Sequence, residues 1–132
     1  METETASFHG LSAWGGVAWV RLTRNGTEVY TGEDKRDQDQ YQANLGLSYR
    51  QGTWAADLLG HFVWWDLGPG SDEGNHDDWL WDLAASKGFA TPWGTTTELF
   101  GTVRNLFNGD QNFDTSRGTE PRWVEGGVRL RF

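Results

Sequence analysis

Residues 54–64 read Trp-Ala-Ala-Asp-Leu-Leu-Gly-His-Phe-Val-Trp and carry the strongest structural signal in the chain. Every second residue is apolar, from Trp54 through Leu58 and Phe62 to Trp64. Alternation with a period of two predicts a β-strand with one apolar face. Because Trp and Tyr are well accommodated at lipid–water boundaries, aromatic residues at both ends of that face are typical of a membrane-crossing strand.

The stretch before it repeats the pattern. Its alternate positions are Tyr41, Ala43, Leu45, Leu47 and Tyr49. We predict a two-residue turn at Gln51-Gly52, which pairs Tyr49 with Trp54 and sets both apolar faces on one side. Ten residues at about 3.3 Å rise span about 33 Å, which a tilt of roughly 40° reduces to about 25 Å, the height of an outer-membrane apolar band.

The composition narrows the class of protein. The chain has 132 residues, which is one domain or part of one. Its hydrophobic fraction is 36%, its mean hydropathy is −0.67, and no apolar run approaches the ~20 residues of a membrane helix. These values are compatible with a membrane β-barrel, because the polar residues of its lumen and loops lower the mean hydropathy. The absence of Cys excludes a disulfide framework and thiolate metal sites, and the net charge of −8 argues against nucleic acid as a partner.

Turn signals and alternation predict about seven strands. They cover residues 1–8, 11–22, 40–51, 53–67, 77–88, 96–107 and 123–132. The strand 11–22 has two candidate stripes, one beginning at Leu11 and the other at Trp14, and the sequence does not separate them. Short connections (9–10, 51–52 and 90–94) alternate with long ones (23–39, 68–76 and 108–122). This sorting is typical of outer-membrane barrels, so we predict antiparallel transmembrane β-strands in a bacterial outer membrane.

The last two predicted strands resemble a known family. Val128, Leu130 and Phe132 share one face of the final strand, which ends on Phe like the assembly signal of outer-membrane proteins. The preceding strand contains Val103-Arg104-Asn105-Leu106-Phe107-Asn108. This motif resembles the penultimate strand of TonB-dependent outer-membrane receptors, and the motif match covers only these last two strands.

The resemblance implies that residues 1–132 are the C-terminal segment of a 22-stranded barrel. It implies import of a scarce nutrient of the siderophore, cobalamin or oligosaccharide class, without catalysis and without a cofactor. The family's plug domain and TonB box have no counterpart in the sequence. The implied partners are therefore the remaining barrel strands and a plug domain, from the same gene or a second chain. The other implied partners are outer-membrane lipid and the TonB energising system, which acts through the plug.

The first four residues bear on whether the sequence is part of a larger barrel. Met1-Glu2-Thr3-Glu4 is acidic and lacks the apolar segment of a signal peptide. An outer-membrane protein needs such a peptide. We therefore expect either that it was removed or that the sequence begins part-way through a larger barrel.

Three alternatives stay open. A self-closed eight-stranded outer-membrane barrel would have a structural or adhesion role, with its long loops as the binding surface. A soluble ligand-binding barrel or sandwich would turn the apolar face inward. An outer-membrane enzyme would carry a site at the mouth of the lumen, although the sequence contains no nucleophile elbow, phosphate loop or paired catalytic carboxylates.

Candidate functional residues lie on the expected polar faces. The lumen-lining or ligand-binding candidates are Asp57, His61, Trp65, Arg104, Arg129 and Arg131. Cross-strand ion pairs with Glu98 and Glu125 are one interpretation of the arginines, and a path for an anionic ligand is the other. The aromatic residues predicted at the membrane interface are Tyr41, Tyr49, Trp54, Trp64 and Trp79.

Metal binding is not predicted. The three histidines, His9, His61 and His76, are scattered and show no ligand spacing. Two predominantly acidic clusters contain oxygen-bearing side chains, the first at Asp72, Glu73, Asn75, Asp77 and Asp78 and the second at Asp110, Asn112 and Asp114. Their oxygen atoms suit calcium, but the EF-hand spacing fails, so we interpret both clusters as solvated loops.

Overall fold

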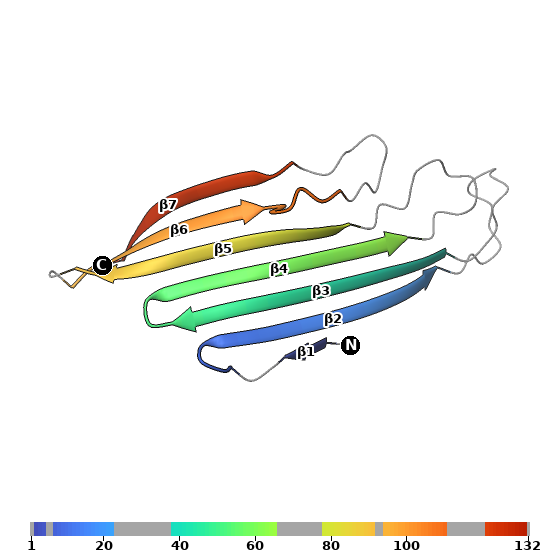
Figure 1. Cartoon of the computed structure of the whole chain (residues 1–132), viewed down its shortest axis with the longest axis horizontal. Coiled ribbons are helices and arrows are strands. Elements are labelled where there is room, and N and C mark those ends of the chain that lie inside the picture. Colours follow the sequence, from blue (N-terminus) through green and yellow to red (C-terminus); the bar gives the residue numbers. More distant parts are fainter. Residues whose placement is uncertain are drawn as a thin grey trace.

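The computed structural model describes residues 2–4, 7–22, 38–65, 78–91, 94–110 and 121–131, and in these every side chain except those of residues 2–4, 22, 38 and 65. Seven strands form one antiparallel sheet in sequence order (Figure 1). They are β1 (Glu2–Glu4), β2 (Leu11–Leu22), β3 (Gln38–Gln51), β4 (Trp54–Trp65), β5 (Trp79–Ala90), β6 (Thr96–Arg104) and β7 (Trp123–Arg131). The predicted all-β, antiparallel fold is confirmed. No described segment is a helix of the length and hydropathy that a membrane crossing requires.

The strand ends sort by the length of the connection that joins them. Those joined by the short connections (β1 to β2, β3 to β4 and β5 to β6) lie at one end of the sheet, on the left in Figure 1. The strand ends joined by the long connections lie at the other. At the predicted turn His9-Gly10, both residues have positive φ, 50° and 83°. Phe8 and Leu11 exchange backbone hydrogen bonds of 2.8 and 2.9 Å around it. We call these the short-turn end and the long-loop end.

The register between β3 and β4 differs from the prediction. Gln51 pairs with Trp54, so the turn residues are Gly52 and Thr53. The predicted pairing of Tyr49 with Trp54 is therefore wrong. Gly52 has a φ of 57°, and type II′ hairpin turns favour glycine with positive φ at the first turn position. Each β3 residue therefore pairs with the β4 residue two positions beyond the predicted one. Because side chains alternate with a period of two, every residue stays on its predicted face.

The register assigns each side chain to one of two faces. The apolar face comprises the odd-numbered residues of β2, β3, β5 and β6 and the even-numbered residues of β4 and β7. The polar face comprises the remaining strand residues. Trp19 pairs with Tyr41 and Leu11 with Tyr49, so the stripe of β2 that begins at Leu11 belongs to the apolar face. The pairing partner, and not the sequence of β2 itself, resolves the two candidate stripes.

The described sheet buries almost none of its large apolar side chains. Val63, which is 3% exposed, is the one large apolar residue that is buried in the described part of the chain. On the apolar face, side chains exposed between 41% and 66% are Leu11, Val17, Trp19, Tyr41, Leu45, Leu47, Trp54, Phe89, Leu99, Val124, Val128 and Leu130. Because a sheet is stabilised by covering such a face, this one requires an apolar neighbour beyond the described residues.

A turn ends β6 earlier than predicted. The strand stops at Arg104 and does not reach Phe107. Asn105 has a φ of 48°, a left-handed conformation that asparagine tolerates better than most residues. Its backbone N–H donates to Asp82 Oδ1 at 2.9 Å, and Asn108 N–H donates to the Asn105 carbonyl at 2.9 Å. The motif that resembles the receptor family therefore includes a turn fastened to β5.

Candidate functional site

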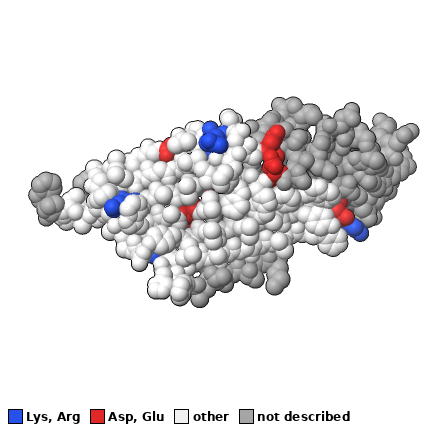
Figure 2. Space-filling model, viewed as in Figure 1, with Lys and Arg blue, Asp and Glu red and all other residues white. Residues whose placement is uncertain are grey.

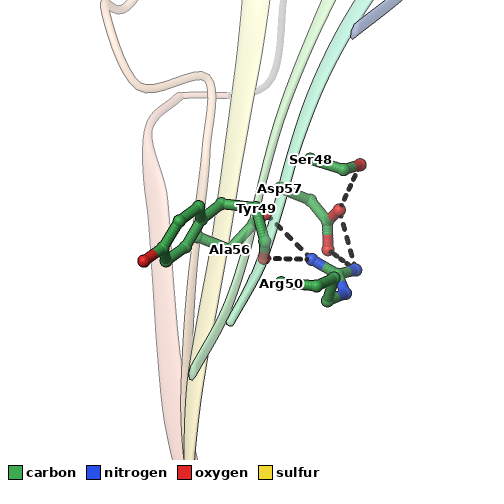
Figure 3. A network of polar contacts seen from close by, with 5 residues as sticks. All are labelled: Ser48, Tyr49, Arg50, Ala56 and Asp57. Atoms are coloured by element: carbon green, nitrogen blue, oxygen red, sulfur yellow. Dashed lines mark hydrogen bonds and ion pairs between the residues drawn. The ribbon is translucent and has the colours of Figure 1, made fainter. Parts of the chain in front are cut away.

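The polar face carries a cross-strand network between β3 and β4. Arg50 Nη2 donates to both carboxylate oxygens of Asp57, at 2.9 and 2.6 Å. Arg50 Nη1 donates to the carbonyl oxygens of Tyr49 and Ala56, each at 2.9 Å. Ser48 Oγ donates to Asp57 at 2.7 Å. Figure 3 shows the Tyr49 ring on the opposite side of the strands from these polar side chains, as strand alternation requires.

His61 lies on the same face and contacts Asn44 directly across the strand pair. Its Nδ1 is 2.6 Å from Asn44 Oδ1. Because an amide oxygen only accepts, Nδ1 is the nitrogen that carries the proton in this arrangement. The contact holds the ring in one orientation, which suits a wall residue as well as a ligand contact.

A second charged cluster joins β6 to β7. Glu98 Oε2 accepts from Arg129 Nη1 at 3.1 Å and from Arg131 Nη2 at 3.2 Å. The Arg129 guanidinium also lies 5.3 Å from the centre of the Phe100 ring. One carboxylate therefore neutralises part of the charge of two arginines. Cross-strand ion pairing thus accounts for Arg129 and Arg131.

The apolar face carries aromatic rows at both ends. At the long-loop end, Tyr41 and Trp64 have ring centres 5.4 Å apart, and Trp79 lies 5.5 Å from Phe62 and 5.4 Å from Trp81. At the short-turn end the face carries Tyr49, Trp54 and Phe89. All five aromatic residues predicted at an interface thus lie on the apolar face, and the register adds Trp19 to the first row.

Charged groups mark the outer limits of these rows. Arg21 Nε and Nη2 donate to the two oxygens of Asp39, each at 2.9 Å, and Trp19 Nε1 donates to the same carboxylate at 3.0 Å. The Arg21 hydrogen bonds hold the pKa of Asp39 below its usual range, against the opposing cost of desolvation. The depressed pKa means that this pair supports the fold at neutral pH, and that the support is lost as pH falls through that pKa.

At the opposite limit, the Lys87 ammonium lies 4.3 Å from the Trp54 ring centre and 5.2 Å from that of Phe89. Between this lysine and the Arg21–Asp39 pair, the apolar face carries no charged residue in the described strands. On the side of the molecule drawn in Figure 2, charged side chains stand apart among uncharged ones, without an extended patch of one sign.

The predicted site residues are distributed along the polar face without converging. Asp57 and His61 belong to networks of β3 and β4, whereas Arg104, Arg129 and Arg131 lie on β6 and β7. The side chain of Trp65 and the whole of Phe132 lie outside the described residues. The ligand-binding role of Trp65 and the assembly role of Phe132 stay predictions. Sequence reasoning overlooked Arg122 and Trp123, which lie beside Arg104; the charge and ring at the start of the last strand were the available signal.

Within the described ranges, no three His, Asp or Glu side chains are grouped as metal ligands. Most of the two acidic clusters lies outside these ranges. Of their members, Asp110 and Asp78 are described, and the Asp110 N–H donates to Asp78 Oδ2 at 3.0 Å. That contact joins the segment after β6 to the residue before β5.

Comparison with known proteins identified no relative: no family model matches the sequence, and no curated protein or solved structure matches the chain. The family resemblance therefore rests on the motif from Val103 to Asn108 and on the final strand. The two faces of the sheet are the features from which we infer a function.

Proposed function

We propose that this sheet is part of the wall of an outer-membrane β-barrel. The apolar face contacts lipid, and the polar face lines a water-filled lumen. The observation that carries the proposal is the register, which places exposed aliphatic side chains between two aromatic rows on one face and hydrogen-bonded charges on the other. Lipid supplies the apolar neighbour that the described sheet lacks, and lumen water solvates the polar face.

The open edges of the sheet support a larger barrel. β1 pairs with β2 over three residues, and β7 pairs within the described part of the chain with β6 alone. In lipid, the unpaired N–H and C=O groups of an open edge cost several kcal/mol each. Additional strands are therefore needed to close the wall.

Within this class, we propose a TonB-dependent receptor that imports a scarce nutrient. The Val103–Asn108 motif and the final strand support this assignment. In such a receptor the 132 residues contribute wall and lumen lining, while a plug domain and the TonB system control passage. The self-closed barrel is the second candidate, because seven strands are one fewer than the smallest outer-membrane barrels contain.

Cysteine labelling tests the membrane proposal directly. The sequence contains no Cys, so single-cysteine variants have no background reaction. Leu45→Cys and Asn44→Cys place the probe on adjacent residues of β3 that face opposite sides. In reconstituted vesicles, we expect the first to react only with a lipid-soluble maleimide and the second to react readily with a charged, water-soluble one.

The same two variants also show which results would contradict the membrane proposal. Fast reaction of Leu45→Cys with the charged reagent would show that the apolar face meets water. Protection of Leu45→Cys from both reagents, in protein that stays soluble without detergent, would show that the face is buried against protein. Either result would contradict the membrane proposal.

A further inference from the structure

The described arginines differ in whether a carboxylate neutralises them. Those in salt bridges of 2.6 to 3.2 Å are Arg21, Arg50, Arg129 and Arg131. Neither Arg104 nor Arg122 lies within 4.0 Å of a carboxylate oxygen in the part of the chain that the structure describes. These two side chains therefore leave positive charge uncompensated among the described groups.

The two arginines that have no carboxylate partner among the described residues line the same hollow. Arg104 ends β6 and pairs directly with Trp123, the first residue of β7. The Arg104 guanidinium carbon is 5.6 Å from the centre of the Trp123 ring. Arg104, Pro121, Arg122 and Trp123 line an open hollow of about 380 Å³. Arg104 and Trp123 lie on the polar face at the long-loop end of β6 and β7, and Pro121 and Arg122 directly precede β7.

This combination of groups fits an oxyanion. Both arginine side chains line the hollow, so an anion seated there meets two positive charges. Guanidinium forks bind carboxylate and phosphate through paired N–H···O bonds, a geometry that a monatomic anion such as chloride cannot match. The Trp123 ring, which is 49% exposed, adds a flat apolar wall for the carbon skeleton that carries the anion.

We propose that the hollow formed by Arg104, Arg122 and Trp123 binds the carboxylate or phosphate group of an anionic ligand. The proposal adds a ligand chemistry to the polar face and rests on the proposed function for the route by which the ligand arrives. It separates Arg104 from Arg129 and Arg131, whose charges are shared with Glu98.

Binding of simple oxyanions to the full chain in detergent micelles tests this site. The probes are inorganic phosphate and citrate, with chloride at equal ionic strength as the reference. The readout is the ¹⁵N-indole resonance of Trp123, assigned with Trp123→Phe. We expect a saturable shift at millimolar concentration, and an affinity about tenfold lower in Arg104→Gln and in Arg122→Gln, as expected for loss of one charge-assisted contact.

Lys87→Gln is the matched control. It removes one positive charge that likewise lacks a carboxylate within the described residues, but on the apolar face, where Lys87 contacts Trp54 and Phe89. Binding should be unchanged in this variant. Arg104→Lys keeps the charge and loses the planar fork, so its affinity should lie between those of the parent and Arg104→Gln.

The outcomes are decisive in each direction. Saturable binding of phosphate, of citrate or of both supports the site and identifies the preferred anion. Absence of a shift with either probe, a shift that chloride reproduces, or equal affinities in the Gln variants and Lys87→Gln would overturn it. Because binding is measured in micelles, its failure leaves the cysteine-labelling result untouched, and failure of that labelling leaves the binding result standing.

Discussion

Arg50 is the best connected side chain of the polar face. It donates to two backbone carbonyls, and both oxygens of Asp57 accept from it. The pair is partly exposed, with 54% of the Arg50 side chain and 31% of the Asp57 side chain accessible. Solvent therefore weakens the Coulomb attraction, and hydrogen-bond geometry supplies most of the specificity.

We predict that Asp57→Asn lowers the free energy of unfolding by about 1 kcal/mol, because it removes the charged acceptor while keeping the shape. Urea titration of the protein in detergent or vesicles measures the change. A double-mutant cycle with Arg50→Met isolates the pair. The control is Glu125→Gln, a carboxylate of the same face for which no ion pair is found among the described residues. Equal effects of Asp57→Asn and Glu125→Gln would contradict the assigned role.

At the residue level, the sequence predicted the faces of the strands and left the partners of the charged residues as alternatives. Alternation alone placed Asp57 and His61 together, because the side-chain period of a strand is two. It also offered cross-strand ion pairs with Glu98 and Glu125 as one interpretation of Arg129 and Arg131, and the structure confirms the pairing with Glu98, which lies 31 and 33 positions away. The register between strands then decides between the alternatives, because it sets Glu98 opposite Arg129. The sequence did not show that Arg104, unlike Arg129 and Arg131, has no carboxylate partner among the described residues.

At the scale of elements, the contact between β4 and β5 depends on a glycine. Gly60 pairs with Trp81, and a Cβ at Gly60 would lie 2.7 Å from the Trp81 ring. Trp81 also stacks on Trp79, so the ring cannot move aside without losing that contact. The absence of a side chain at Gly60 lets the indole lie flat across the strand.

We predict that Gly60→Ala destabilises the protein by about 1–3 kcal/mol, the usual cost of overpacking. Gly101→Ala is the matched variant on the same face, because the nearest atom to its added Cβ, the Glu125 carbonyl oxygen, is 3.8 Å away. That variant should be neutral or slightly stabilising, since alanine restricts the unfolded chain more than glycine does. Unfolding titrations of both proteins make the comparison. Similar losses in the two variants would show that the ring does not depend on Gly60.

Strand identity could be predicted far better than strand register. Alternation located β2 with the bounds that the structure has, and located β3, β4 and β7 within two residues at each end. The turn between β3 and β4 was misplaced by one residue because the conformation of Gly52, and not the dipeptide alone, selects the turn type. The strand β6 was predicted too long because Asn105 adopts a left-handed conformation that apolar alternation does not reveal.

For the whole molecule, the two faces decide what the sheet requires from its surroundings. The large exposed side chains of the apolar face and the single buried large apolar residue of the described part show that these strands do not form a conventional core. The sequence indicated this arrangement through its low mean hydropathy and strict alternation. It did not define what completes the wall, because closure depends on strands that pair with the sheet edges.

The last prediction concerns that closure. We expect native mass spectrometry of the detergent-extracted protein from outer membranes to show a species larger than the 14.9 kDa of these 132 residues. Denaturing mass spectrometry of the same sample then distinguishes one longer polypeptide from a non-covalent assembly of several chains. The physical reason is that, in the membrane location proposed above, an open edge leaves backbone groups unpaired in lipid, so the strands that pair with it are extracted together with it. A lone species of 14.9 kDa would instead favour the self-closed small barrel. Quantitative recovery without detergent would contradict both barrels, because the apolar face would then be covered by protein.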